Sequence, residues 1–594
     1  MSRGICILQF SILCLYFNLV SEMKKCFTYC IFLLVLLTCN LLRNVHGSNA
    51  SNKSRQDVAN VAWQTASKLV KSACKMTLYP QICVSSLASY HEHSGSYQDL
   101  TKSAVKLALL RLHQLSALAS GISHESWKGK QGVALADCIQ LFLFSTDQLN
   151  ESHSVLVALK SESVERQIND VQTWLSASLT NLRTCTDGLK NLDGTVKTRI
   201  YEKVQNVSAM VSNSLAFANG ICSSTRRNKM RMDFSHHRRL FWNGDGISRG
   251  LSRRGRSINE DFPAGMSKED RRLLMSAQAG IKVDVMVAKD GSGKYRTIAD
   301  ALNAAPMQSQ KRYVIYIRGG IYEEKLIVTK QNIMLVGDGK GVTVIAGSNS
   351  HTQDSSPLTA NFMACANGFM ARDITFQNTA GPYKGQAAAL LVRSDRSVFY
   401  RCSIIGYQDT LYAHSQRQFY RECDIYGTID FIFGNAAAVF QACNLIARKP
   451  LKGQSNVITA QGRGDPNENT GFSMHNCTVL AAADLVPAEK SVPTHLGRPW
   501  QKYARTVYMQ CFMDNLVQPS GWLEWDGNFA LKTLYYGEYM NSGPGAATAN
   551  RVQWPGYRVI KSAMEASQFT VNGLINGYSW LPSTGVVYQG GLIQ

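Results

Sequence analysis

The chain has 594 residues, of which 45% are hydrophobic and 18% are charged. This composition is typical of a packed globular protein and excludes a mostly disordered one, and the length corresponds to about four domains at roughly 150 residues each. Lys and Arg outnumber Asp and Glu by 63 to 42, which gives a formal net charge of +21. Such a charge attracts polyanions of any chemistry, so it does not separate nucleic acid from an acidic polysaccharide.

A secretory signal is predicted at the N-terminus. Two lysines precede an apolar run from Cys26 to Leu42, and the chain becomes polar after it. This order of segments is typical of a signal peptide, so we assign residues 1–47 to targeting. The signal is complete when read from Met23, which makes residues 1–22 an upstream extension. A membrane anchor is the alternative, because the run is close to the shortest length that spans a bilayer.

Cysteines and glycosylation triplets agree with export. The chain has 16 cysteines, which in an oxidising compartment are disulfide candidates rather than metal ligands. Glycosylation triplets begin at Asn49, Asn52, Asn150, Asn206 and Asn476. No pair of CxxC motifs and no HExxH motif occurs, so we expect no metal and no other cofactor. Export also argues against nucleic acid as the partner of the basic chain.

Residues 50–222 are predicted to form a helical domain. From residue 55 onwards apolar residues recur at helical spacing, and stretches of ~15–25 residues are separated by short breaks. This pattern predicts an antiparallel bundle, although a generic helical domain fits it as well. Cys74 and Cys83 bracket a short hairpin at its edge. Cys138 and Cys185 lie on separate predicted helices, but spacing alone does not fix how cysteines pair.

A basic linker is predicted at residues 223–274, which hold 13 Lys or Arg against 6 Asp or Glu. Two dibasic motifs lie in or beside it, Arg238-Arg239-Leu240 and Arg271-Arg272-Leu273-Leu274. Exposed basic segments are good substrates for processing proteases, and a solvated charge run is the alternative. Removal of residues through 274 leaves 29 basic and 22 acidic residues, a net charge of +7.

From about residue 280 the pattern changes to short β-branched and aromatic runs, without long helices to connect them. Three similar runs begin at Phe399, Phe419 and Phe440 and end at Cys402, Cys423 and Cys443. The cysteines lie 21 and then 20 residues apart. A repeat of this length, built from short strands with no helix, predicts the stacked coils of a parallel β-helix.

This fold predicts a pair of acids. Asp409 lies seven residues after Cys402, and Asp430 lies seven residues after Cys423. Equal phase on successive coils stacks the two aspartates on one face, with their backbones about 4.8 Å apart. Carboxylates that close do not both ionise freely, so one is suited to act as nucleophile or base and the other as acid. A purely structural ladder of aspartates is the alternative.

Two glutamines lie near these acids in the sequence. Gln386 and Gln408 are neutral hydrogen-bond donors, which suits them to stabilise an oxyanion. Carboxylates ~5 Å apart also suit a retaining glycosidase, so a polysaccharide hydrolase or lyase on the same fold is a second hypothesis. The glutamine pair favours acyl chemistry.

The C-terminal motifs resemble those of plant pectin methylesterases. In that family's order they are Gly320-Ile-Tyr-Glu-Glu324, Gln386-Ala-Ala-Ala-Leu390, Gly406-Tyr-Gln-Asp-Thr-Leu-Tyr412, Asp430-Phe-Ile-Phe-Gly-Asn435 and Leu496-Gly-Arg-Pro-Trp500. Residues 50–222 resemble the family's inhibitor-like pro-region through the Cys74–Cys83 hairpin, Ala136-Asp-Cys138 and Thr184-Cys-Thr-Asp-Gly188. The resemblance implies an all-β enzyme at residues 275–594, a right-handed parallel β-helix, preceded by an all-α four-helix-bundle pro-domain.

The resemblance also implies roles for the site residues. Asp430 would be the nucleophile that attacks the methyl ester of a galacturonate unit. Asp409 would be the proton donor to the leaving methanol and would then activate water. Gln386 and Gln408 would hold the oxyanion, and Arg498 would orient Asp430 and keep it ionised.

Substrate binding is implied for six residues: Ser356, Gln386, Tyr412, Phe433, Arg498 and Trp500. The three aromatic residues would offer their faces to sugar rings. Residues 352–361 depart from the family's pattern, because Ser356 stands where the family carries a threonine and the neighbouring aromatic residue is missing. We expect this departure to affect subsites rather than chemistry.

Further properties follow from the same resemblance. It implies the disulfides Cys74–Cys83, Cys138–Cys185 and Cys423–Cys443, and processing at Arg271-Arg272-Leu273-Leu274 by a subtilisin-like protease. The expected substrate is methyl-esterified homogalacturonan (pectin) in the extracellular cell wall. The bundle would mask the enzyme before processing, and a separate proteinaceous inhibitor is a further expected partner.

Overall fold

The computed structural model describes residues 68–88, 96–122, 129–160, 163–190, 192, 194–240, 282–351 and 358–593, with the backbone alone at 195 and 222–240. By its contacts the chain divides into two units, residues 1–65 and 66–594, and all described residues belong to the second. The predicted signal, the processing motif at 271–274 and Ser356 lie outside the described residues. Within those residues, no helix has both the length and the apolar composition needed to cross a bilayer.

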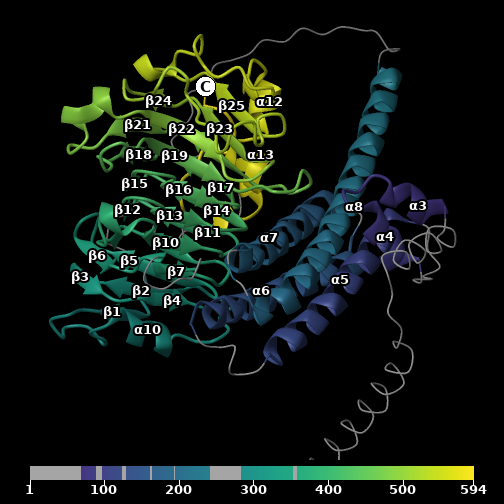
Figure 1. Ribbon diagram of the computed structural model, residues 1–594, viewed down its shortest axis with the longest axis horizontal. Helices are drawn as coiled ribbons and strands as arrows, with labels where there is room; N and C mark the ends of the chain where they lie inside the picture. Colours follow the sequence, from purple (N-terminus) through teal and green to yellow (C-terminus); the bar gives the residue numbers. More distant parts are fainter. Residues whose placement is uncertain are drawn as a thin grey trace, which may run out of the picture. The chain divides into compact units, whose positions relative to one another are not determined.

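Four long helices form the predicted bundle (Figure 1). They are α5 (Tyr97–Ser120), α6 (Gly129–Val157), α7 (Val164–Lys190) and α8 (Thr195–Leu240). Each packs against two of the others, in the closed ring α5–α6–α7–α8–α5. α8 continues to Leu240, so the first part of the predicted 223–274 linker is helical.

Helical spacing of small and apolar residues explains why these segments pack. In α5 the buried residues recur three or four positions apart: Leu100, Ala104, Ala108, Leu112, Leu115 and Ala119. Ser96 begins the helix, because its hydroxyl accepts a hydrogen bond from the Asp99 N–H at 3.1 Å. The stripe therefore faces the bundle core, together with the small polar residues Thr101 and Ser103, which are also buried.

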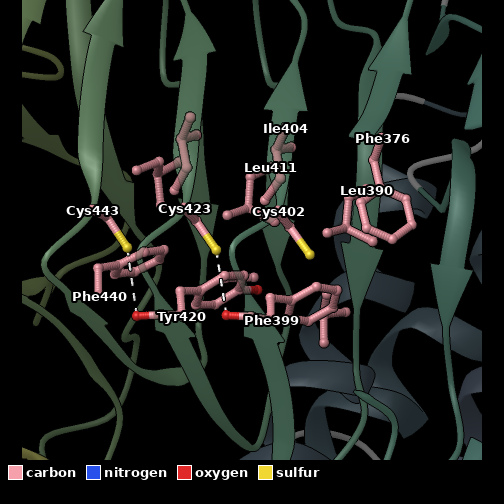
Figure 2. Close-up of a cluster of buried hydrophobic side chains, with 14 of the residues drawn as sticks. Phe376, Leu390, Phe399, Cys402, Ile404, Leu411, Tyr420, Cys423, Phe440 and Cys443 are labelled. Atoms are coloured by element: carbon pink, nitrogen blue, oxygen red, sulfur yellow. Dashed lines mark hydrogen bonds between the residues drawn. The ribbon is translucent and has the colours of Figure 1, made fainter. Parts of the chain in front are cut away.

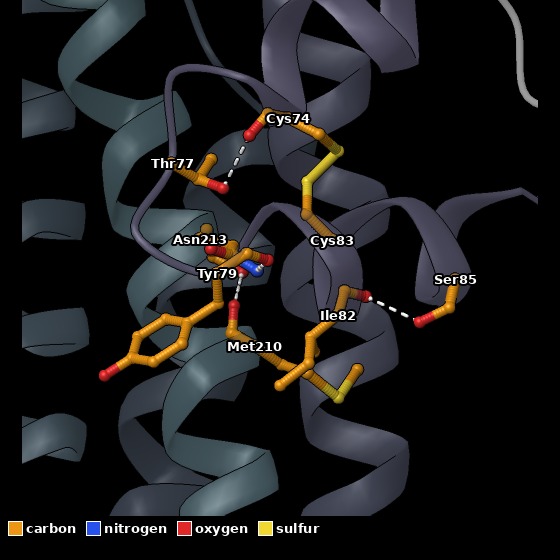
Figure 3. The surroundings of a disulfide bond; sticks show 9 residues. Cys74, Thr77, Tyr79, Ile82, Cys83, Ser85, Met210 and Asn213 are labelled. Atoms are coloured by element: carbon orange, nitrogen blue, oxygen red, sulfur yellow. Dashed lines mark hydrogen bonds between the residues drawn. A yellow bond between two sulfur atoms is a disulfide. The ribbon is translucent and has the colours of Figure 1, made fainter. Parts of the chain in front are cut away.

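Two disulfides fasten the helical part. A hairpin at its edge consists of α3 (Lys68–Cys74) and α4 (Pro80–Leu87). The Cys74–Cys83 disulfide closes this hairpin, as Figure 3 shows. A second disulfide joins Cys138 on α6 to Cys185 on α7. Both pairings implied by the resemblance in this region are present.

The C-terminal part is a parallel β-helix of three sheets in which every ladder is parallel (Figure 1). The eleven-stranded sheet contains β1 (Val285–Val287), β2 (Tyr313–Ile317), β5 (Ile333–Gly337), β8 (Met370–Arg372), β11 (Ser397–Tyr400), β14 (Arg417–Arg421), β17 (Ala437–Gln441), β20 (Gly471–His475), β23 (Arg505–Met509), β25 (Tyr535–Tyr539) and β26 (Tyr557–Val559). The eight-stranded sheet contains β3 (Gly320–Glu323), β6 (Thr343–Gly347), β9 (Thr375–Asn378), β12 (Ser403–Ile405), β15 (Asp424–Gly427), β18 (Asn444–Ala447), β21 (Thr478–Ala481) and β24 (Phe512–Met513).

The seven-stranded sheet is the one that carries the candidate site. It contains β4 (Leu326–Val328), β7 (Ala360–Ala364), β10 (Ala388–Val392), β13 (Leu411–Ala413), β16 (Ile432–Gly434), β19 (Asn456–Gln461) and β22 (Thr494–Pro499). The remaining α-helices of this part are short: α10 (Ile298–Ala304), α12 (Ala563–Ser567) and α13 (Val571–Ile575). The expectation of strands without long connecting helices is thus confirmed for the described residues.

The predicted repeat forms a ladder in the core, which Figure 2 shows. Phe399, Tyr420 and Phe440 occupy one register on β11, β14 and β17, and their rings stack with centroids 5.0 and 4.6 Å apart. Phe419, the first residue of the middle run, lies one position before this row. A strand turns successive side chains to opposite faces, so Phe419 instead packs on the outside, against Tyr588.

The cysteines of the repeat differ from the expectation. Cys423 and Cys443 are thiols, so the third implied disulfide is absent from the structure. The Cys423 sulfur lies 3.3 Å from the Phe399 carbonyl, and the Cys443 sulfur lies 3.5 Å from the Tyr420 carbonyl (Figure 2). Each thiol therefore donates to the backbone of the preceding coil instead of bonding to its neighbour.

Candidate active site

A cavity of about 350 Å³ lies against the seven-stranded sheet. Tyr412, Phe433, Ala460 and Arg498 occupy one register across β13, β16, β19 and β22, and all four line the cavity. The preceding residue Leu411 points into the core, so this row faces outward. The other lining residues are His351, Thr359, Gln386, Ala387, Ala388, Gln408, Asp409, Asp430, Trp500 and Trp525.

Asp409 and Asp430 lie at equivalent positions on successive coils, as the spacing predicted. Leu411 on β13 and Ile432 on β16 are partners in the parallel register. Asp409 lies two residues before Leu411, and Asp430 lies two residues before Ile432. The Asp409 N–H donates to the Ile429 carbonyl at 3.0 Å, which ties one turn to the next. Both aspartates have left-handed φ values, +61° and +51°. Left-handed φ values recur at other turns of the described β-helix, among them Arg401 and Glu422, so they belong to the fold as well as to the site.

Arg498 forms a bidentate ion pair with the carboxylate of Asp430. Its Nε and Nη2 atoms lie 2.8 and 2.6 Å from the two carboxylate oxygens. Asp430 is only 6% exposed. Burial raises the pKa of Asp430 above its usual value, and the Arg498 guanidinium opposes that rise. The predicted orienting contact is present, and it limits the rise in pKa rather than reversing it.

Asp409 has the higher proton affinity of the pair. Burial raises the pKa of Asp409 well above its usual value, and the negative charge of Asp430 raises it further. Arg498 and a hydrogen bond from Gln386 oppose this rise but do not cancel it. The pair is therefore asymmetric: Asp409 retains its proton more readily than Asp430, which has the arginine as its direct partner.

The two glutamines lie beside the acids. Gln386 contacts the Asp409 carboxyl group, and Gln408 is the residue immediately before Asp409. The Ala387 N–H donates to the Gln408 carbonyl at 3.2 Å, so the two glutamine segments are stacked on adjacent coils. Both side chains line the same cavity as the acids. Two neutral donors thus face the place where a reacting carbonyl would lie.

Aromatic residues form one wall of the cavity. Tyr412 and Phe433 stack with ring centroids 4.2 Å apart and an interplanar angle of 16°. Trp500 stands across them, 6.4 Å from Tyr412 and 6.0 Å from Phe433. All three predicted aromatic residues therefore lie together beside the acids.

Six lining residues were not predicted as site residues from the sequence: three alanines, and the larger side chains of His351, Thr359 and Trp525. Thr359 lies close in sequence to Ser356, the predicted binding residue that falls outside the described residues. Trp525 comes from an irregular segment after β24, where the sequence repeat has ended. No spacing signal points to it.

Comparisons with known proteins agree with this site. The family model described as Pectinesterase matches residues 284–578. The model described as Plant invertase/pectin methylesterase inhibitor matches residues 68–217. Fold and site therefore define a carboxylic ester hydrolase that acts on pectin. An inhibitor-like bundle precedes it in the chain.

Relatives extend over both parts of the chain. It is 45% identical to "Probable pectinesterase/pectinesterase inhibitor 34" of Arabidopsis thaliana over 92% of this chain and 89% of that protein. It is 43% identical to "Probable pectinesterase/pectinesterase inhibitor 61" of the same plant, over 88% of this chain and 87% of that protein. The chain belongs to the pectinesterase family, whose reaction removes methyl esters from pectin.

A solved structure matches the C-terminal part alone. Pectin methylesterase from carrot is 53% identical, with a TM-score of 0.52, over 53% of this chain and 100% of that chain. The carrot chain is covered completely by half of this one, so the solved β-helix of that protein has no bundle attached. The experiments proposed below therefore use residues 275–594 as a separate protein.

Proposed function

We propose that Asp430 is the nucleophile and Asp409 the proton donor in the hydrolysis of pectin methyl esters. The observation that carries the proposal is the asymmetry of the stacked pair. Arg498 holds both oxygens of Asp430, whereas Asp409 is buried with its pKa raised well above the usual value. A nucleophile must be ionised and a general acid must hold a proton, and the unequal proton affinities of the pair support this division of roles.

The first half-reaction forms an acyl-enzyme. A carboxylate oxygen of Asp430 attacks the C6 carbonyl of a methyl-esterified galacturonate, and the carbonyl electrons move to its oxygen. The side-chain N–H groups of Gln386 and Gln408 donate to this oxyanion. The carbonyl re-forms as the methoxy group leaves with the proton of Asp409. The products are methanol, an anhydride between Asp430 and the sugar acid, and an ionised Asp409.

The second half-reaction restores the enzyme. Asp409, now a carboxylate, accepts a proton from a water molecule that attacks the C6 carbonyl of the anhydride. The bond to Asp430 breaks, which releases the galacturonic acid and returns Asp430 to its ion pair with Arg498. Each proton and charge returns to its starting place, so the cycle needs no cofactor.

The substrate chain would run along the aromatic wall. We propose that Tyr412, Phe433 and Trp500 contact sugar faces and that Ser356, Gln386 and Arg498 bind polar groups of neighbouring units. The supporting observation is that every described member of this set lines one cavity. The sugars can then approach the acids only from the outer side of the seven-stranded sheet.

Methanol release tests the proposed reaction. Residues 275–594 are expected to release methanol from methyl-esterified homogalacturonan without shortening it. New reducing ends or a rapid fall in viscosity would instead favour the polysaccharide hydrolase or lyase hypothesis. Failure of a folded protein, verified by circular dichroism, to release methanol would contradict the proposed function.

We also propose that the chain is exported to the cell wall and cut by a subtilisin-like protease at Arg271-Arg272. A signal-like N-terminus and a basic segment between two folded parts support this proposal. N-terminal sequencing of the secreted protein would locate the cut. A separate inhibitor protein with the same bundle fold is a further proposed partner of the released enzyme.

Masking by the bundle is proposed for the uncut chain, on the contacts of α7. The Thr184 hydroxyl lies 3.1 Å from Nε2 of His414, the residue that follows β13. The Asn435 amide donates to the Thr180 hydroxyl at 2.8 Å. Tyr412 belongs to the same apolar cluster as the bundle core, and Phe433 and Trp500 pack against that cluster. The aromatic wall that would receive sugars is thus in contact with a helix.

Ion pairs also connect α7 to the β-helix. Asp170 on α7 lies 2.6 Å from Arg417 and 3.1 Å from Arg396 of the β-helix. Arg417 is 1% exposed and also pairs with Asp395 at 2.6 Å. Many of the other contacts of this face are hydrogen bonds between neutral side chains. A face of this kind separates more readily than a purely apolar one.

Masking is predicted to weaken as the pH rises. Burial raises the pKa of Glu151 on α6 to about 7, and the negative charge of Asp395 adds to the rise. A carboxyl group whose pKa is raised by docking stabilises the docked state only while it is protonated. The docked state therefore loses stability as the pH rises towards about 7, to the extent that Asp395 and burial by the β-helix cause the rise in pKa.

Calorimetric titration of the cut bundle into residues 275–594 between pH 5 and 8 measures this effect. We expect weaker binding at pH 8 than at pH 5, and a smaller difference for Glu151→Gln, which is neutral throughout. Equal pH dependence in the two proteins would show that Glu151 is not the group responsible.

A further inference from the structure

Arg498 has a second partner in addition to Asp430. The centre of its guanidinium lies 4.5 Å from the ring centroid of Trp525, and both residues line the cavity. The edge of the guanidinium is occupied by Asp430 through Nε and Nη2. The indole therefore covers a face of the group while the carboxylate holds its edge. A cation over an aromatic face is attracted electrostatically, and the planar guanidinium also stacks on it.

The backbone around Trp525 is anchored to the strand that carries Arg498. The Leu523 N–H donates to the Gly497 carbonyl at 3.0 Å, and the Leu496 N–H donates to the Gly521 carbonyl at 2.7 Å. Trp522 is 1% exposed and stacks on Tyr536 with centroids 4.1 Å apart. The segment thus continues the seven-stranded sheet beside β22, and Trp525 is held in place although its own side chain is 37% exposed.

The two partners of Arg498 respond differently to the reaction. This step rests on the proposed function, in which Asp430 becomes an uncharged anhydride in the acyl-enzyme. The negative charge then passes to Asp409, which also attracts Arg498, but the guanidinium loses its bidentate contact with a charged Asp430. The attraction to Trp525 does not depend on the charge of Asp430, so it persists. We propose that Trp525 is a positioning residue that keeps Arg498 in place while Asp430 is acylated.

A test without turnover uses Asp430→Asn, which removes the charge of Asp430 and keeps its shape. The readout is the exchange with water of the Arg498 Nε–H, measured by NMR on ¹⁵N-labelled residues 275–594. With Asp430 intact, Trp525→Leu is expected to accelerate exchange less than twofold. In the Asp430→Asn background, Trp525→Leu is expected to accelerate it at least tenfold. Equal effects in the two backgrounds would overturn the proposal, whether or not the protein is an esterase.

Kinetics give a second, independent readout. Trp525→Leu is expected to lower kcat about tenfold with little rise in KM, because deacylation becomes slow. Methanol then appears in a burst equal to the enzyme concentration, followed by a slow phase. Trp525→Phe keeps an aromatic face and is expected to recover most of kcat. Phe529→Leu is the matched control, since Phe529 is 39% exposed nearby and does not line the cavity.

A role of Trp525 in sugar binding alone predicts different kinetics. If Trp525 only contacts a sugar, Trp525→Leu raises KM, leaves kcat unchanged and produces no burst, which would overturn the proposal. Absence of methanol release from the unsubstituted protein would contradict the proposed function instead, and the exchange experiment would still decide the role of Trp525.

Discussion

Asp430→Ala is expected to abolish methanol release, with a loss of about 10⁴-fold or more in kcat, as found when a nucleophile is removed from a covalent mechanism. The substitution removes the attacking oxygen and leaves Arg498 without its ion pair. Methanol release by residues 275–594 is the measurement, and the midpoint of thermal unfolding serves as the control for folding. A variant that folds normally and retains more than a few per cent of the activity would rule out Asp430 as the nucleophile.

Asp409→Asn separates the two roles further. On methyl esters it is expected to be nearly as inactive as Asp430→Ala, because methoxide is a poor leaving group without a proton. An ester with a better leaving group, such as a nitrophenyl ester of galacturonate, does not need that proton. We therefore expect Asp409→Asn to release one equivalent of nitrophenol and then stop, whereas Asp430→Ala releases none. Equal behaviour of the two variants would contradict the assignment of roles.

The second large effect is expected from cutting the linker. A tethered bundle is present at an effective concentration on the order of millimolar, so it occupies its docking face almost continuously. A cut alone leaves the bundle bound, but dilution of the cut protein to nanomolar concentration then releases it. We expect the uncut chain to be nearly inactive and the cut, diluted chain to match residues 275–594 in methanol release.

Two variants make this prediction specific. Replacement of both Arg271 and Arg272 by glutamine should prevent cutting and keep the chain inactive. Thr184→Arg places a bulky cation against His414 and should activate the uncut chain without proteolysis. If the uncut chain is already as active as residues 275–594, the bundle does not mask the site.

The acid pair was predictable from the sequence because residues at the same position on successive coils of a β-helix lie next to each other. The distance from each cysteine to its aspartate was enough to place Asp409 beside Asp430. The core row of aromatic residues follows the same phase, since Phe399, Tyr420 and Phe440 each lie three residues before the cysteine of their run. Arg498, Tyr412, Phe433 and Trp500 came from the family resemblance, since no spacing argument reaches them.

The parts that could not be predicted lack a repeat. Trp525 follows the last strand of the eight-stranded sheet, and its place depends on backbone hydrogen bonds to β22 that no side-chain pattern records. The helical extension of α8 beyond residue 222 lies in a sequence rich in charge, where apolar periodicity gives no signal. The thiols of Cys423 and Cys443 show that proximity on adjacent coils does not by itself make a bridge.

The turns that carry the two acids differ in length from those beside them. Asp409 lies in the turn of residues 406–410 and Asp430 in the turn of residues 428–431, between the eight-stranded and seven-stranded sheets. The corresponding turns on the flanking coils, residues 379–387 and 448–455, are longer. Insertions in the turn of residues 448–455, or in the other turn well before Gln386, would alter the ends of the cavity without shifting a residue assigned to the chemistry. Selectivity for particular patterns of methylation can therefore diverge among relatives while the hydrolytic step stays the same.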